Sequence, residues 1–105
     1  MSELDKLFAI IASRKGGDPA QSYTAKLLAA GVEKCAKKFG EEATEAVIAA
    51  ISRDKTELAK ESADVLYHLA VLWAASGITP EEVYAVLRAC EGQSGLAEKA
   101  SRPKS

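Results

Sequence analysis

Residues 41–45, Glu-Glu-Ala-Thr-Glu, and residues 61–64, Glu-Ser-Ala-Asp, are the two segments around which the fold is organised. Their five acids fall at helical spacing in two clusters. The surrounding sequence is rich in alanine and leucine and has few aromatic residues or β-branched runs, a composition that favours helices over strands. The sequence therefore predicts an all-α protein in which the acids lie on helices.

Length and charge limit the size and the partners of the protein. The chain has 105 residues, 48% of them hydrophobic, which suits one domain over residues 1–105 with a modest core. We therefore expect a homodimer. The 14 basic and 15 acidic residues give a net charge of −1, so no global field would draw the chain to nucleic acid or to an anionic membrane. Any binding of phosphates must be local.

The two cysteines and the start of the chain indicate an ordinary intracellular protein. Cys35 and Cys90 lie in separate predicted helices without zinc-binding spacing, so we expect reduced, packed side chains. The apolar run at residues 7–12 is too short for a secretory signal, and no stretch approaches the roughly 20 apolar residues of a membrane span. A cytoplasmic location is the resulting expectation.

Caps and glycines divide the chain into helical ranges. Ser22, Asp54 and Thr79 are predicted N-caps, and Gly40 and Gly77 are predicted to separate or end helices. The expected helices cover residues 2–14, 22–30, 32–39, 41–52, 55–76 and 80–90. Residues 92–105 are expected to form a loosely structured tail.

Glu61 and Asp64 occupy an unusual position on the longest predicted helix. At about 100° per residue, Asp64 falls near −60° from Glu61, within the arc that also holds Val65 and Leu72. An ionised carboxylate facing a core costs several kcal/mol unless it is paired or bound to a metal. These two acids are therefore the strongest indication of a bound cation.

Glu41, Glu42 and Glu45 share one arc of the preceding helix, although a solvated helix start favoured by the helix dipole would also explain them. A short connection makes the two helices antiparallel neighbours, so Glu42 and Glu45 could face the acids of the longer helix. Four carboxylates without histidine or cysteine suit Mg²⁺, with Mn²⁺ as a possible substitute.

Basic residues just upstream could complete a phosphate site. Lys34, Lys37 and Lys38 could meet phosphates that a carboxylate-bound metal leaves exposed, and a solvated charged face is the alternative. His68 follows Asp64 by one turn and is expected to be a packed, hydrogen-bonded residue rather than a ligand or base. Tyr67 is expected to serve packing or a subunit interface.

These motifs resemble a known enzyme family. Glu-Glu-x-x-Glu followed by Glu-x-x-Asp is the signature of the all-α nucleoside triphosphate pyrophosphohydrolases, which include MazG and the dimeric dUTPases. Further segments are similar to the phosphoribosyl-ATP pyrophosphohydrolases of histidine biosynthesis. These segments are residues 22–28, Gly31 with Lys34, residues 37–45, residues 63–69 and residues 95–102.

The resemblance implies a MazG-like antiparallel bundle of about four to five helices, completed by dimerisation. From the apolar content of the helices and the small size of the chain, Trp73, Leu69 and Val83 are expected at the dimer interface. The resemblance also implies Mg²⁺-dependent hydrolysis of phosphoribosyl-ATP to phosphoribosyl-AMP and pyrophosphate. The implied roles fall on named positions of this chain. Metal ligands are Glu42, Glu45, Glu61 and Asp64; candidates for the catalytic base are Glu41, Glu42 and Glu45; substrate-binding residues are Lys34, Lys37, Lys38, Lys26 and Arg102.

Two other functions remain open at this point. One is a house-cleaning enzyme that hydrolyses free or modified nucleoside triphosphates. The other is a non-catalytic helical dimerisation module whose acids bind metal. The segment Ala-Cys-Glu-Gly at residues 89–92 departs from the basic residue found there in many relatives, which leaves the C-terminal contribution to the substrate open.

Overall fold

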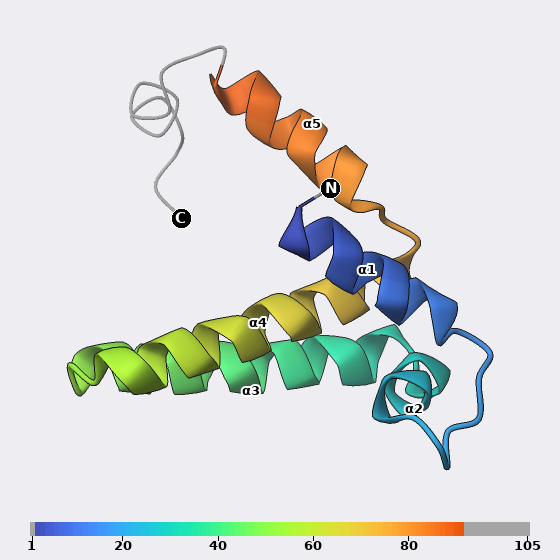
Figure 1. Ribbon diagram of the computed structural model, residues 1–105, viewed down its shortest axis with the longest axis horizontal. Coiled ribbons are helices and arrows are strands. Elements are labelled where there is room, and N and C mark those ends of the chain that lie inside the picture. Colours follow the sequence, from blue (N-terminus) through green and yellow to red (C-terminus); the bar gives the residue numbers. More distant parts are fainter. Residues whose placement is uncertain (1, 92–105) are drawn as a thin grey trace.

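The computed structural model describes residues 2–91, and their regular structure is helical throughout, which confirms the all-α prediction (Figure 1). The five helices are α1 (Glu3–Ser13), α2 (Tyr23–Ala30), α3 (Val32–Ile51), α4 (Lys55–Ser76) and α5 (Pro80–Glu91). The predicted tail at 92–105 lies outside the described residues. None of the described helices is both long and apolar enough to cross a membrane.

The helices α3 and α4 form an antiparallel hairpin that is the longest feature of the molecule (Figure 1). The turn between them is short, with Arg53 in the left-handed region at φ 59°. Asp54 caps α4 as predicted, because its side chain accepts a hydrogen bond of 3.0 Å from the backbone N–H of Glu57. The hairpin therefore places the acids of α3 opposite those of α4.

The prediction that Gly40 separates two helices is wrong, since α3 runs unbroken from Val32 to Ile51. A glycine inside a helix costs about 1 kcal/mol relative to alanine, which packing against a neighbouring helix easily outweighs. Gly40 does not adopt a positive φ, and its carbonyl accepts a hydrogen bond of 3.0 Å from the Thr44 hydroxyl. One continuous helix therefore carries both the upstream lysines and the glutamates.

The other predicted boundaries agree closely with the structure. The Ser22 hydroxyl accepts a hydrogen bond of 3.1 Å from the N–H of Ala25 at the start of α2. Thr79 accepts a hydrogen bond of 3.3 Å from the N–H of Glu82, and Gly77 ends α4 at φ 75°. Caps and left-handed glycines supply the hydrogen bonds that helix ends lack, so they could be recognised from sequence alone.

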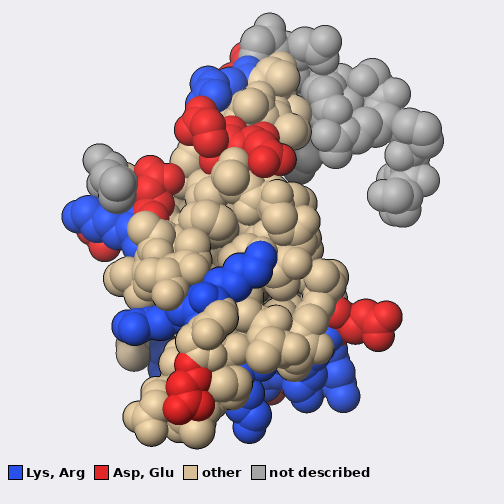
Figure 2. Space-filling view, turned by 90° about the vertical axis from the view of Figure 1, so that its right-hand side faces the viewer, with Lys and Arg blue, Asp and Glu red and all other residues tan. Residues whose placement is uncertain are grey.

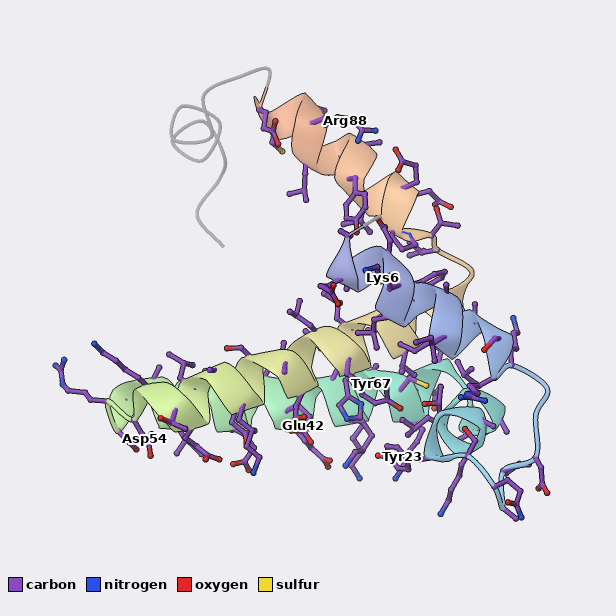
Figure 3. All side chains as sticks on the ribbon, in the orientation of Figure 1. Lys6, Tyr23, Glu42, Asp54, Tyr67 and Arg88 are labelled. Atoms are coloured by element: carbon purple, nitrogen blue, oxygen red, sulfur yellow. The ribbon has the colours of Figure 1, made fainter. Side chains whose placement is uncertain are left out.

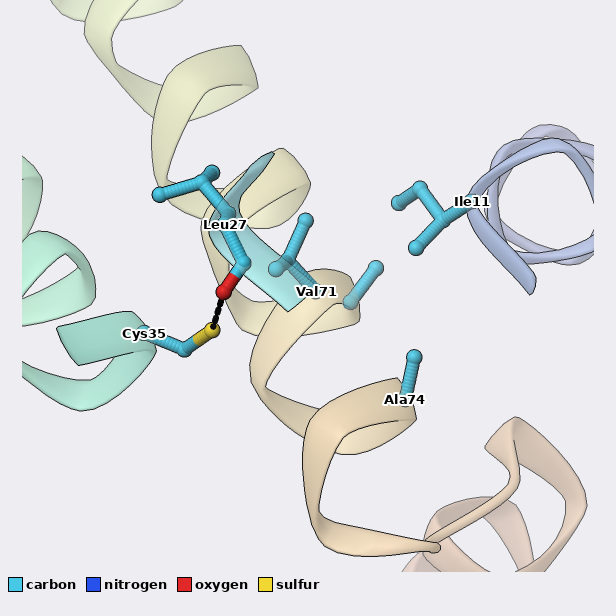
Figure 4. Packing of buried hydrophobic residues seen from close by; sticks show 6 residues of the cluster. Ile11, Leu27, Cys35, Val71 and Ala74 are labelled. Carbon is cyan, nitrogen blue, oxygen red and sulfur yellow. Dashed lines mark hydrogen bonds between the residues drawn. The ribbon is translucent and has the colours of Figure 1, made fainter. Parts of the chain in front are cut away.

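A small core forms where α1 and α2 pack on one half of the hairpin (Figure 4). Cys35 is fully buried there, and its thiol donates a hydrogen bond of 3.2 Å to the carbonyl of Leu27. Burial raises the pKa of this thiol, which keeps it protonated. The core cluster comprises Ile11, Leu27, Cys35, Ala70, Val71 and Ala74. The prediction of a packed, unpaired Cys35 is confirmed, and Cys90 is unpaired and half-buried.

Apolar side chains remain exposed away from this core. Helix α5 projects from the rest of the molecule and carries Val86 at 65% exposure beside Leu87 (Figure 1). A shallow apolar cavity of about 340 Å³ runs along this face. Trp73, by contrast, is only 8% exposed and packs within the chain, so this expected interface residue has little surface left for a partner.

Candidate functional site

Three carboxylates meet across the α3–α4 hairpin. Glu42 comes from α3, and Glu61 and Asp64 come from successive turns of α4. One oxygen from each lies within 4.8 Å of the other two, and all three residues are half-buried. This acid cluster brings together three of the four metal ligands that the resemblance implies. Its oxygen-only donors, open on one side to solvent, fit a hard divalent cation with water in its coordination shell.

The electrostatics of the acid cluster also favour a cation. Partial burial raises the pKa of Glu61, and a hydrogen bond with Glu57 and the negative charge of Asp64 raise it further. Glu61 therefore holds a proton to higher pH than an isolated glutamate does. A divalent cation would take the place of that proton and neutralise the crowded carboxylates.

The remaining predicted acids lie outside the acid cluster. Glu45 is exposed and is not one of the three clustered carboxylates. The face of α3 against α4 passes through Ala46 and Ala49, and Glu45 is turned from Ala46 by about 100°. Glu41 is also exposed. Its Oε1 lies 3.2 Å from Nζ of Lys38 and forms an ion pair with it. This pairing raises the pKa of Lys38.

A basic pocket adjoins the acid cluster. It has a volume of about 280 Å³ and lies between α2 and the first turns of α3. Its lining consists of Tyr23, Lys26, Leu27, Ala30, Lys34 and Lys38. Three of the lysines that were expected to bind substrate thus line one pocket. Lys37 is exposed and is not among the lining residues, and Arg102 lies outside the described residues.

Basic groups are numerous on one face of the molecule. On the face in Figure 2, they lie mostly in the lower half, the level at which α2 lies in Figure 1, where some acidic side chains lie among them; further acidic side chains lie near the top. Because the net charge is only −1, attraction of a phosphate depends on such local groups.

His68 and two tyrosines connect the pocket with the acid cluster. The His68 side chain is 7% exposed, and its Nε2 lies 4.0 Å from Oε1 of Glu42. Its ring meets those of Tyr67 and Tyr23 edge to face, with centroids 4.9 and 6.4 Å away. The Tyr67 hydroxyl shares a hydrogen bond with the hydroxyl of Thr24. Figure 3 shows Glu42 and Tyr23 on the same, lower side of the helices.

Burial lowers the pKa of His68, although the Glu42 carboxylate acts in the opposite direction. The imidazole is therefore neutral near neutral pH. The prediction that His68 is packed is confirmed. Its Nδ1, however, is buried without a hydrogen-bond partner, contrary to the expectation of a hydrogen-bonded histidine.

Sequence reasoning did not assign Tyr23 to the site. Considered by composition, residues 22–24 are only a helix start. The helical spacing of Tyr23, Lys26, Leu27 and Ala30, which places them on one face of α2, is the signal that could have found this wall of the pocket.

A carboxylate cluster beside a pocket of lysines can bind a metal-complexed polyphosphate and hold its charged oxygens. The model of the family described as phosphoribosyl-ATP pyrophosphohydrolase matches residues 4–90. The chain belongs to this family. Every residue of the acid cluster and of the basic pocket lies within the matched range.

Curated relatives agree with this assignment to the phosphoribosyl-ATP pyrophosphohydrolase family. A phosphoribosyl-ATP pyrophosphatase of Cereibacter sphaeroides is 60% identical over 102 residues, which cover 97% of this chain and 99% of that protein. That of Parvibaculum lavamentivorans is 60% identical over 101 residues, with 96% and 93% covered. That of Ruegeria pomeroyi is 57% identical over 104 residues, with 99% of both covered. The family resemblance stated from the sequence is confirmed.

Proposed function

We propose that this protein hydrolyses phosphoribosyl-ATP between its α and β phosphates, giving phosphoribosyl-AMP and pyrophosphate in the second step of histidine biosynthesis. Family membership and relatives named phosphoribosyl-ATP pyrophosphatase support this proposal. The observation that carries it is that the acid cluster of Glu42, Glu61 and Asp64 lies one helical turn from a pocket lined by three lysines, since Lys38 of the pocket precedes Glu42 by four residues on α3.

In this proposal Glu42, Glu61 and Asp64 hold Mg²⁺, for which Mn²⁺ can substitute, and Glu45 is a further candidate ligand from the next turn of α3. The bound cation would neutralise the triphosphate and stabilise the leaving pyrophosphate. A different rotamer of Glu45 would bring its carboxylate toward the acid cluster, since α3 already places Glu45 one turn from Glu42.

The protein's own groups orient the reactants. Lys26, Lys34 and Lys38 bind phosphate oxygens as point charges in the basic pocket, with Lys37 and Arg102 as further candidates. Water attacks phosphorus, the bond to the bridging oxygen breaks, and a carboxylate accepts the proton of the water. Glu41, Glu42 and Glu45 are the candidates for that base. Glu41 is also held by Lys38, a contact that phosphate could replace.

We also propose that the protein acts as a single-domain homodimer in the cytoplasm. The exposed apolar face of α5, which includes Val83, Val86 and Leu87, supports a partner subunit there. Leu69 is half-buried and could add to the interface. Sedimentation should give a dimer at micromolar concentration; a stable monomer would contradict this part of the proposal.

The decisive assay measures pyrophosphate release from phosphoribosyl-ATP and from a panel of free nucleoside triphosphates. Release should be fastest with phosphoribosyl-ATP, should stop when EDTA removes divalent metal, and should return with Mg²⁺ or Mn²⁺. Faster hydrolysis of free nucleotides would indicate the house-cleaning type of enzyme. Metal binding without hydrolysis of any triphosphate would indicate a non-catalytic module.

A further inference from the structure

His68 occupies a position that simple packing does not explain. Within residues 2–91 it is the sole polar side chain that is buried. A buried imidazole without hydrogen bonds is unfavourable, because each of its nitrogens leaves water without a replacement partner. An apolar side chain of the same size would fill this space at lower cost. The surroundings of the two ring nitrogens therefore indicate what the imidazole does.

The two nitrogens face different surroundings. Nδ1 is fully buried and has no hydrogen-bond partner among the described residues. Nε2 points toward the acid cluster and lies 4.0 Å from Oε1 of Glu42. A neutral imidazole carries its proton on only one nitrogen. With the proton on Nε2, the ring presents a donor to a carboxylate; with the proton on Nδ1, a buried donor would be orphaned and a lone pair would face the carboxylate. The structure therefore favours the Nε2–H tautomer.

Two tyrosine rings also pack around the imidazole and restrict its rotation. Tyr67 and Tyr23 meet it edge to face at interplanar angles of 80° and 86°. Tyr67 is itself fixed through its hydroxyl by Thr24 on α2. Side-chain donors held in this way are typical of the groups that orient metal ligands.

His68 is not placed as a ligand or as the base. The clustered oxygens that could share a cation belong to Glu42, Glu61 and Asp64, and neither nitrogen of His68 is among the grouped atoms. Its side chain is 7% exposed, which leaves little access for the water that a base must deprotonate. A role through Glu42 remains.

We propose that His68 is a positioning residue whose Nε2–H donates to the carboxylate of Glu42 and fixes that carboxylate for metal binding. This inference rests on the proposed function only in that it takes Glu42 to be a metal ligand. When a cation draws the acid cluster together, a shift of about 1 Å brings Nε2 and Oε1 to hydrogen-bond distance. The other Glu42 oxygen then remains free for the cation.

The test measures Mn²⁺ binding by calorimetry in the absence of substrate. His68→Phe removes the donor while keeping a ring of similar size, and loss of an outer-shell partner typically weakens metal binding about 10- to 100-fold. His68→Gln can place an amide N–H where Nε2 lies and should stay within a few-fold of wild type. Tyr67→Phe is a graded comparison: it removes the bond to Thr24 but leaves the donor to Glu42 in place, so it should weaken Mn²⁺ binding less than His68→Phe does.

A second measurement does not depend on any variant. Nitrogen NMR of the unsubstituted, metal-free protein at neutral pH should show His68 as the Nε2–H tautomer. An Nδ1–H tautomer, Mn²⁺ binding by His68→Phe as tight as wild type, or binding by His68→Gln as weak as His68→Phe would each overturn the inference.

These outcomes are separable from those of the proposed function. If the wild type hydrolyses phosphoribosyl-ATP while His68→Phe binds Mn²⁺ normally, only the role of His68 is wrong. If Mn²⁺ binding depends on His68 while phosphoribosyl-ATP is not hydrolysed, the positioning role is supported and the proposed function fails.

Discussion

The two halves of the α3–α4 hairpin use the same helices in opposite ways. Near Cys35 and Val71, α1 and α2 cover the hairpin, and the buried side chains are apolar. Near Glu42 and Glu61, the facing side chains are carboxylates that repel one another. The core half therefore stabilises the fold through apolar burial. In the acid half, repulsion between the carboxylates that form the site lowers stability. Substitutions in the two halves should accordingly separate activity from stability.

The largest expected effect is on activity in the acid half. Asp64→Asn removes one clustered carboxylate charge while keeping the shape of the side chain. Metal stabilisation of the transition state amounts to several kcal/mol, and about 1.4 kcal/mol is tenfold in rate, so hydrolysis should fall at least about 10³-fold. The melting temperature of the metal-free protein should be unchanged or higher, as circular dichroism can measure.

The control for this prediction compares two glutamates of α3. Glu42→Gln should lose activity as Asp64→Asn does, whereas Glu33→Gln, at an exposed position in the first turn, should keep it. Equal loss of activity in both glutamine variants would contradict the division between the halves.

The next effect is on stability in the core half. Ile11 is 1% exposed, so Ile11→Ala should destabilise the fold by about 2–5 kcal/mol, because it leaves a cavity against α4. Ile10→Ala is the matched control: Ile10 is 55% exposed, and its truncation should change stability by about 0.5 kcal/mol or less. Urea unfolding gives both values. The reverse order would mean that the core is not where the structure places it.

A smaller effect depends on pH. The raised pKa of Glu61 means that its protonated form stabilises the fold at low pH and that this contribution is lost as the pH rises through the folded-state pKa. Without metal, Glu61→Gln should therefore raise the melting temperature at pH 7, and the gain should vanish below about pH 4, where the unfolded glutamate is also protonated. Saturating Mg²⁺ should reverse the order at pH 7 by stabilising only the wild type.

The division between the halves also decides what the sequence could predict. The N-caps at Ser22, Asp54 and Thr79 are local signals, so the first residues of α2, α4 and α5 were predictable. The acid cluster was predictable in outline because Glu61 and Asp64 stand on an apolar arc. Whether Glu45 joins Glu42 depends on the rotation of α3 against α4, which is a tertiary property.

Other features of the site were not predictable because they depend on contacts between distant segments. The pocket wall at Tyr23 needs α2 to lie against α3, and the environment of His68 needs Tyr23 of α2 and Glu42 of α3 to lie close to its ring. The break at Gly40 was predicted from the local preference of a single glycine, and the prediction failed because packing of α3 against α4 outweighs that weak preference.

The smallest expected effect tests the junction of the two halves, which is Gly40. Its backbone φ is not positive, and a Cβ added there meets nothing within 4 Å. Gly40→Ala should therefore stabilise the protein by about 0.5–1 kcal/mol, because alanine loses less conformational entropy in a helix. Gly77→Ala is the opposing control, since Gly77 has φ 75° and a Cβ there is strained. If Gly40→Ala is instead destabilising, α3 bends at this glycine in solution, and the halves are joined by a hinge. If it is stabilising and phosphoribosyl-ATP hydrolysis is unchanged, α3 is continuous through Gly40 and the site needs no flexibility at this glycine.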